Sequence, residues 1–234
     1  MKQKIYEIPI WDAYALENCE CPVCSIEKKA EDQFIETLFT EMVMDVNLNP
    51  QLTSAFRFCH EHFEKLYKYP DKCGLAILTD RILYLEIEAL QQAKKGTAIK
   101  KSLKPAFLKK SSSNSTHTEK ECLLCNKLSN DMRNYCDTII KLWQKDSTFK
   151  SIFAHSRGFC LKHFNEILIN NTASSDFKEK CISLQENNLQ RLQEELQWFI
   201  TKNDYRFVNE SWKTSKDALL RTILKLIGNY NTKI

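Results

Sequence analysis

A set of four residues of metal-binding types, three Cys and one His, occurs twice in this chain of 234 residues, each time as Cys-x2-Cys, 34 intervening residues and Cys-x2-His. The first set comprises Cys21, Cys24, Cys59 and His62. The second set comprises Cys122, Cys125, Cys160 and His163. Every position of the second set follows its counterpart by 101 residues, so the sets align without a gap. Three thiolates and one imidazole are a donor set typical of tetrahedral Zn²⁺.

A lone Cys-x2-Cys is weak evidence for metal, but two complete sets with one spacing favour it strongly. Four protein donors leave no open coordination position, so we predict two structural zinc ions per chain and no catalytic residue. We expect each repeat to close a site with its own four residues. The rival arrangement is exchange, in which Cys-x2-Cys of one repeat meets Cys-x2-His of the other. A [4Fe–4S] cluster held by the same donors is the alternative cofactor.

The remaining cysteines lack aligned cysteines. Cys136 aligns with Ile35, and Cys181 lies on an apolar helical stripe, so we expect both to be buried thiols. Cys19 precedes Cys21 by two residues and is the one candidate for a replacement ligand, whereas Cys73 has no such relation to a set. Three histidines align with no histidine and are not expected to bind metal: His60, His117 and His155.

The elements that must position these donors are predicted to be helices, because the chain has only four glycines and five prolines and 43% of its residues are hydrophobic. An apolar stripe with steps of three and four residues predicts a helix over 125–144. Asp146 or Ser147 is suited to capping a short helix that follows. Gly158 then permits a turn before a third helix near Cys160. The first repeat gives the same order, with Pro50 near the start of its short helix.

Each repeat continues into a longer helix with an apolar seam. These seams consist of Leu75, Leu78, Ile82, Leu85 and Ala89, and of Phe177, Cys181, Leu184, Leu192, Leu196 and Phe199. Ser215 is predicted to cap a final helix whose apolar side is Leu219, Leu220, Ile223, Leu224 and Ile227. This helix either closes the bundle or contributes to a functional site in the preceding polar-aromatic segment, with Asp204, Tyr205, Arg206, Trp212, Lys216 and Arg221.

The predicted fold class is therefore all-α, with two tandem helical subdomains, each held by a Cys3His site, and a C-terminal closing helix. We place the first repeat at 1–93, a linker at 94–118, the second repeat at 119–200 and the C-terminal segment at 201–234. Residues 94–110 contain seven lysines and no acid. A solvated connector is the favoured interpretation of this linker, and a nucleic-acid contact through charge alone is the sharper alternative.

The motifs "ENCECPVC", the paired Phe-Cys-x2-His-Phe and the tail "DYR…W..SKDAL.R.I.KLIG" resemble an uncharacterised bacterial family, common in anaerobes, that carries a domain of unknown function. The resemblance covers nearly the whole chain. It implies the same eight Cys and His positions and implies no reaction.

We therefore expect a cytoplasmic metal-binding protein that acts as a scaffold or interaction module for an unknown macromolecular partner. No apolar run is long enough for a membrane span, and no signal peptide is evident. A non-enzymatic role is favoured, because the sequence has no Ser-His-Asp constellation, no phosphate-binding Gly loop and no H-E-x-x-H helix. An iron–sulfur or zinc-dependent redox or catalytic protein is the first alternative. Nucleic-acid binding through the lysine-rich linker is the second.

Overall fold

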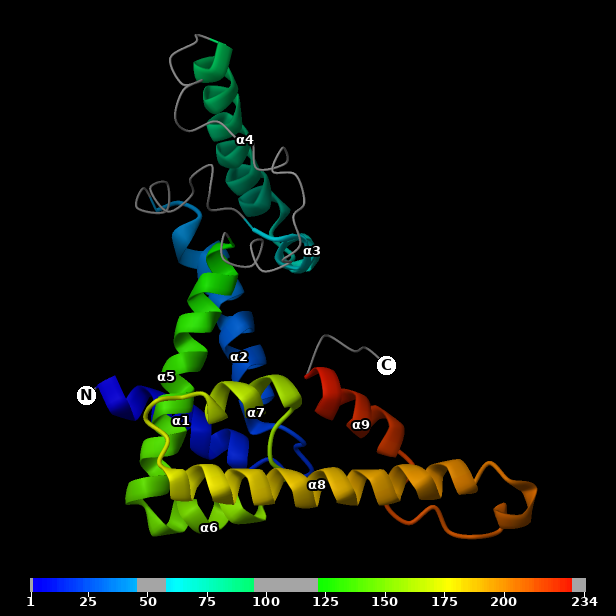
Figure 1. Cartoon of the computed structure of the whole chain (residues 1–234). Helices are drawn as coiled ribbons and strands as arrows, with labels where there is room; N and C mark the ends of the chain where they lie inside the picture. The colour runs from blue at the N-terminus through cyan, green and yellow to red at the C-terminus, as the bar shows by residue number, and fades with distance from the viewer. Residues whose placement is uncertain (1, 46–57, 95–121, 229–234) are drawn as a thin grey trace. The chain divides into compact units, whose positions relative to one another are not determined.

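The computed structural model describes residues 2–45, 58–94 and 122–228, and every regular element in this part of the chain is a helix (Figure 1). The all-α prediction is confirmed. The described residues divide into two compact units, each of which contains one Cys/His cluster. Unit 1 comprises Met1–Lys29 and Asp131–Ile234, and unit 2 comprises Ala30–Asn130. Each unit therefore combines segments from both halves of the sequence. The repeat boundaries proposed above remain a prediction about how the sequence is organised.

Two helices belong to both units, because the divisions fall inside α2 (Pro22–Thr37) and α5 (Leu123–Lys145). The other elements of unit 1 are α1 (Lys2–Tyr14), α6 (Ser147–His155), α7 (Leu161–Leu168), α8 (Ser175–Thr201), a 3₁₀ turn η5 (Tyr205–Phe207) and α9 (Ala218–Ile227). The other elements of unit 2 are a π-helical turn η1 (Leu38–Met42), α3 (His60–Lys68) and α4 (Lys72–Lys94). None of the described helices is long and apolar enough to cross a membrane.

The core of unit 1 is aromatic. Four phenylalanines, Phe149, Phe153, Phe159 and Phe177, are fully buried. The Phe153 ring lies tilted against Phe159 and Phe177, with centroids 5.9 Å and 5.5 Å apart, within the range of distances over which aromatic rings attract one another. Against this core α9 packs on α8 and α7 (Figure 1). The rigid platform places the start of α7 beside the start of α2, where the first cluster lies.

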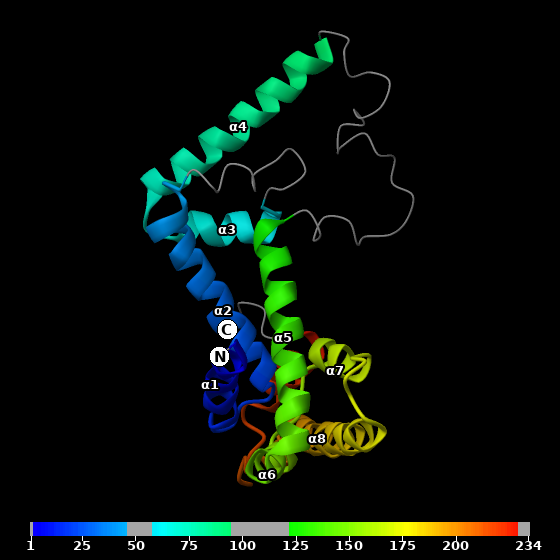
Figure 2. The same ribbon diagram turned by 90° about the vertical axis from the view of Figure 1, so that its left-hand side faces the viewer.

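The core of unit 2 is mostly aliphatic. Leu38, Leu66 and Leu78 are fully buried, and the Phe39 ring stacks on Tyr69 at 4.4 Å. From the end of α3, α4 diverges, so that its second half extends away from the other described helices of this unit (Figure 2). The second half of α4 therefore keeps several apolar side chains exposed.

The expected order of helices in the second repeat is confirmed. The helix predicted over 125–144 is α5, and the short helix that follows is α6, whose N-cap is Asp146. The Asp146 carboxylate accepts hydrogen bonds from the backbone N–H groups of Thr148 and Phe149. Gly158 has a φ of 74°, a conformation that glycine adopts without strain. Pro50, the corresponding marker in the first repeat, lies outside the described residues.

The final helix forms as predicted, but its start and its buried side differ from the prediction. Asp217, not Ser215, occupies the N-cap position of α9. The hydroxyl of Ser215 instead donates to the carbonyl of Trp212 at 2.7 Å. The side of α9 that faces the protein carries Ala218 and the cations Arg221 and Lys225, while much of the expected apolar side stays partly exposed. This inversion follows from a buried carboxylate, described below, that requires cationic partners.

Candidate metal centres

The eight predicted donors gather into two clusters, and each cluster takes one pair from each repeat. The first cluster is Cys21, Cys24, Cys160 and His163. The second cluster is Cys59, His62, Cys122 and Cys125. In each, the four donor atoms all lie within 4.8 Å of one another. The expectation that each repeat closes its own site is therefore wrong, and the exchanged arrangement is the one in the structure.

The first cluster, hereafter site 1, is formed by the starts of two helices in unit 1. Cys21 precedes α2 and Cys24 lies in its first turn, where the Cys24 N–H points to the Cys21 sulfur at 3.4 Å. Cys160 is the N-cap of α7, and His163 follows within the first turn. The His163 Nδ1 atom lies 3.5 Å from the Cys21 sulfur and 3.3 Å from each of the other two sulfurs. All four side chains are buried.

Site 2 repeats this construction in unit 2. Cys122 precedes α5 and Cys125 lies in its first turn, while Cys59 is the N-cap of α3. The His62 Nδ1 atom lies 3.0 Å from the Cys59 sulfur and 3.3 Å from each of the other two sulfurs. Unlike the donors of site 1, Cys59 and Cys125 are only half-buried. The two sites thus share donors and spacing but differ in their access to solvent.

Both ligand histidines turn their second ring nitrogen toward a carboxylate of α2. The Nε2 atom of His163 lies 3.2 Å from Glu27, and that of His62 lies 2.9 Å from Glu31. When the imidazole is neutral, as metal binding requires, a carboxylate at Nε2 favours the tautomer with a proton on Nε2 and a free lone pair on Nδ1, the nitrogen that faces the sulfurs. Burial opposes ionisation of Glu27, but His163 and Lys162 outweigh it and lower the pKa of this carboxyl to about 2.

The sequence analysis missed these two carboxylates. Their only signal is position: Glu27 follows Cys24 by three residues, and Glu31 follows Glu27 by four, so both lie on the same side of α2. The 101-residue alignment hides them, because the aligned residues in the second repeat are Leu128 and Met132. One repeat therefore supplies the carboxylates for both histidines.

In each donor set the electrostatics favour one thiolate paired with a charged imidazole. Burial disfavours a charged imidazole, but hydrogen bonds to Cys122 and Glu31 raise the pKa of His62 to about 10. The same balance, with Cys160, Cys24 and Glu27 as partners, raises the pKa of His163 to about 12. A hydrogen bond from Cys125 is the largest influence that lowers the pKa of Cys122, to about 3. Hydrogen bonds from Cys21 and Cys24 likewise lower the pKa of Cys160. Burial raises the pKa of Cys21, and a hydrogen bond to Cys122 raises that of Cys125. Each cluster thus stabilises one thiolate, the form of cysteine that binds metal.

The distances within each cluster fit a single ion. Donors about 2.3 Å from a tetrahedral centre lie about 3.8 Å from one another. The Cys24 and Cys160 sulfurs are 3.5 Å apart, and the Cys59 and Cys125 sulfurs are 3.8 Å apart. An iron–sulfur cubane would hold its thiolates on separate irons and would spread them further.

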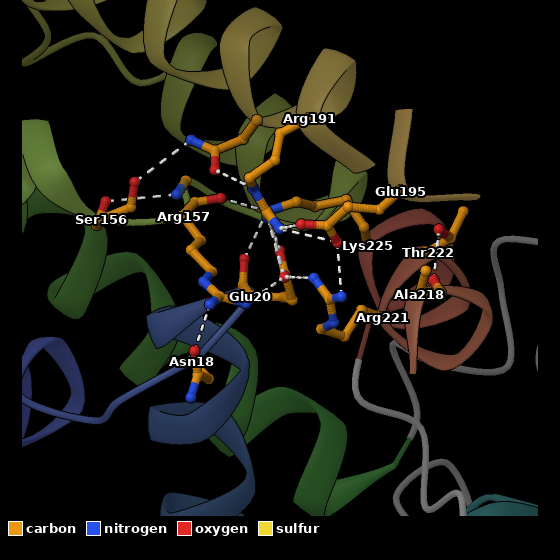
Figure 3. A network of polar contacts seen from close by, with 12 residues as sticks. Asn18, Glu20, Ser156, Arg157, Arg191, Glu195, Ala218, Arg221, Thr222 and Lys225 are labelled. Carbon is orange, nitrogen blue, oxygen red and sulfur yellow. Dashed lines mark hydrogen bonds and ion pairs between the residues drawn. The ribbon is translucent and has the colours of Figure 1, made fainter. Parts of the chain in front are cut away.

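A network of charged side chains surrounds the chain just before Cys21 (Figure 3). Its centre is Glu20, whose side chain is 4% exposed. Four cations lie within ion-pair distance of this carboxylate: Arg157 at 3.0 Å, Arg191 at 2.8 Å, Arg221 at 3.4 Å and Lys225 at 3.3 Å. Arg221 also pairs with Glu195 at 2.6 Å and with Asp217 at 2.9 Å. These seven residues carry four positive and three negative formal charges.

Lys225 links this network to both donor-bearing loops of site 1. Its ammonium donates to the backbone carbonyl of Glu20 at 2.7 Å and to the carbonyl of Arg157. The first carbonyl directly precedes Cys21, and the second lies three residues before Cys160. At the end of α9, a Cβ atom on Gly228 would lie 3.6 Å from the sulfurs of Cys24 and Cys160. Helix α9 therefore closes over site 1 and fixes the loops that carry its donors.

The other cysteines and histidines in the described part of the chain stay outside the clusters. Cys136 and Cys181 are buried in the core of unit 1, as predicted. Cys19 is half-buried and Cys73 is exposed, and neither belongs to a cluster. The His155 ring bonds to its own helix at the Ser151 carbonyl. His60 is exposed, and His117 lies outside the described residues.

The residues suggested for a second functional site in the C-terminal segment take separate structural roles. Asp204 and Arg206 form an exposed pair with each other, at 2.6 Å. Arg221 belongs to the buried network. Tyr205 projects into solvent and is 83% exposed. The segment is held instead by Lys202, a buried residue that donates to the carbonyls of Phe207, Val208 and Glu210.

Fold and site together define a class: helical proteins with two buried Cys/His clusters of a composition that could hold metal ions. Within that class, the chain belongs to the Family of unknown function (DUF6062), whose model matches residues 1–233. This membership confirms the resemblance noted from the sequence motifs.

A curated relative covers most of the chain. It is the "Uncharacterized 23.9 kDa protein in xynA 3'region" of Caldicellulosiruptor sp. (strain Rt8B.4), which is 26% identical over 194 residues. The match spans 81% of this chain and 85% of that protein. No solved structure matches the chain.

Proposed function

We propose that the protein is a zinc-binding helical scaffold in which two ions act as structural cross-links between the repeats. The donors of site 1 would be Cys21, Cys24, Cys160 and His163. Those of site 2 would be Cys59, His62, Cys122 and Cys125. The observation that carries this proposal is the convergence of three sulfurs and one imidazole nitrogen within 4.8 Å in each cluster. A zinc ion bound there would supply folding free energy and no open coordination position for chemistry.

The exchange of pairs gives these ions a large effect on the unfolded chain. Site 1 joins Cys24 to Cys160 across 136 residues, and site 2 joins His62 to Cys122 across 60 residues. On a loop-entropy model, cross-links of these lengths restrict the unfolded chain by roughly 5 and 4 kcal/mol, respectively. Repeats joined in this way would be stabilised together, a property suited to a scaffold.

Charge balance also supports a divalent ion at site 1. The network around Glu20 has one more positive than negative formal charge. A divalent ion on three thiolates and a neutral imidazole carries one negative charge, which offsets this excess. The contacts of Lys225 place the extra cation against the donor-bearing loops.

Metal counting in serine variants tests both the ion and the exchange. We expect two zinc ions per chain in the parent protein and one in the double variant Cys21→Ser/Cys160→Ser, because both changes fall in site 1. The double variant Cys21→Ser/Cys59→Ser should lose both ions, because it damages both sites. The matched control is Cys19→Ser, which should keep two ions. If sites closed within repeats, the two double variants would exchange their results.

The colour of the protein tests the identity of the metal. A preparation made without oxygen should be colourless and contain zinc. A brown preparation with iron and absorption at about 400 nm, as thiolate-bound iron shows, would overturn the zinc assignment in favour of redox chemistry at the same residues.

A further inference from the structure

The long helices of the two repeats, α4 and α8, can be compared residue by residue. Their least exposed positions correspond when α4 is shifted by 103 residues: the buried Leu78 matches the buried Cys181, and the half-buried Leu85 matches the buried Asn188. The shift exceeds 101 because the connection from α7 to α8 is longer than that from α3 to α4. The two helices therefore turn equivalent sides toward their own units.

At four outward positions the two helices are chemically opposite. On α8 these four positions are polar and exposed: Glu186, Asn187, Gln190 and Gln193. The equivalent positions on α4 are apolar: Leu83 at 60% exposure, Tyr84 at 60%, Ile87 at 52% and Leu90 at 62%. We name these four residues the α4 stripe. Since α8 shows that this helix position is compatible with polar residues, the stripe is not required by packing inside the unit.

The stripe is large enough to be an interaction surface. The four side chains expose on the order of 400 Å² together, within the range of the largest functional patches on monomeric proteins. Leu83, Ile87 and Leu90 follow one another at steps of four and three residues, the spacing of a helix-pairing seam. The partner expected for such a seam is another helix.

We propose that the stripe pairs with the stripe of a second copy of this chain, with the two α4 helices antiparallel and a two-fold axis at Ile87. The argument is charge complementarity at the two ends of the seam. The seam positions beyond the stripe are Asp80 on one side and Lys94 on the other, and both are exposed. Antiparallel pairing about Ile87 brings Asp80 of each copy toward Lys94 of the other. Parallel pairing would oppose Asp80 to itself and Lys94 to itself, which is unfavourable.

The surface is self-complementary, as a two-fold dimer requires. Because two stripes bury on the order of 800 Å² in total, the dimer belongs to the weak end of specific interfaces. The inference goes beyond the proposed zinc scaffold and does not depend on which metal is bound.

The mass of the zinc-loaded full chain in solution tests the pairing. Sedimentation equilibrium at concentrations from roughly 10 µM to 1 mM should show a monomer–dimer equilibrium between 27.5 kDa and twice that mass. The decisive variant transfers the outward residues of α8 to α4: Leu83→Glu, Tyr84→Asn, Ile87→Gln and Leu90→Gln. It should raise the dissociation constant at least tenfold while helicity and metal content stay unchanged.

The control variant removes exposed apolar surface elsewhere. Ile182→Glu and Ile200→Glu change two α8 residues that are 48% and 64% exposed, and dimerisation should persist. A parent protein that stays monomeric throughout this range would overturn the proposal, and so would a transferred-face variant that dimerises as the parent does.

The orientation has its own measurement. Cys73 is exposed and lies 14 residues before Ile87. At 1.5 Å per residue, spin labels on Cys73 of two antiparallel copies would be separated by about 40 Å along the helix axes. Dipolar spectroscopy should find this distance, and Cys73→Ser should abolish the signal. A separation below about 20 Å would indicate parallel helices and refute the arrangement.

Discussion

Replacing Lys225 by methionine should weaken metal binding at site 1, although Lys225 is not one of its donors and acts only through the loops that carry them. Methionine keeps the length and much of the apolar volume of the side chain but removes the ammonium. The change leaves two backbone carbonyls, the buried one of Glu20 and the half-buried one of Arg157, without the donor that they share. Glu20 itself remains paired with three arginines.

The magnitude follows from those contacts. Each carbonyl that loses its only charged donor costs roughly 1–3 kcal/mol. Burial lowers the pKa of Lys225, against the opposing influence of Glu20, so removal of the charge recovers part of its desolvation cost. The net loss expected is roughly 2–4 kcal/mol, or roughly 4–16 °C in melting temperature for a protein of this size.

Two assays separate this effect from general damage. Thermal unfolding of Lys225→Met is compared with Lys216→Met, an exposed lysine of the same segment, which should change the melting temperature by less than about 2 °C. A chelator competition is then run in a Cys122→Ser background, which leaves only site 1 able to bind strongly. There Lys225→Met should accelerate metal loss, since the loops before Cys21 and Cys160 have lost their common anchor. Unchanged melting and unchanged metal release would refute the positioning role of Lys225.

Two further predictions concern residues near the donors. Glu27→Gln should weaken metal affinity about 10–100-fold at site 1 only, and Glu31→Gln should do the same at site 2 only, because each carboxylate orients a different ligand histidine; competition titrations in the Cys122→Ser and Cys21→Ser backgrounds measure them separately. Cys136→Val should retain both metal ions and cost less than about 1.5 kcal/mol of unfolding free energy, since it nearly conserves the volume of a buried thiol; loss of one ion in a metal count would show instead that Cys136 is a ligand.

The sequence was sufficient for the donors and for the local elements that carry them. The offset of 101 residues identifies all eight positions, because a duplication preserves spacing while most other residues drift. Local signals also sufficed for α5 and α6: a stripe at steps of three and four residues, then an Asp that caps the next helix. Such features depend on residues only a few positions apart in the sequence, so a single repeat is enough to predict them.

Those local signals could not predict which Cys-x2-Cys pair would form a site with which Cys-x2-His pair. A gap-free repeat shows which residues of the two repeats correspond. The alignment is the same whether Cys-x2-Cys forms a site with Cys-x2-His of its own repeat or of the other repeat. Nothing near Cys24 records that its partner lies 136 residues away at Cys160. The prediction of the buried side of α9 was wrong for a similar reason. The apolar stripe of α9 predicts the wrong buried face, because the buried Glu20, some 200 residues earlier, pairs with Arg221 and Lys225 and so places these two cations in the interior.

The exchanged pairing also bears on how such a duplicated chain arises. Each repeat supplies two of the four donors of each site. A protein with a single repeat and this arrangement would therefore complete its sites only when two copies associate. Joining the copies makes that association intramolecular and replaces its dependence on protein concentration with an effective concentration set by the connection. Once joined, the two sites are free to diverge. Site 1 has the Glu20 network, α9 and complete burial, whereas site 2 keeps Cys59 and Cys125 half-exposed. We infer that the fusion made this division possible, since identical sites in a symmetric pair of copies cannot differ.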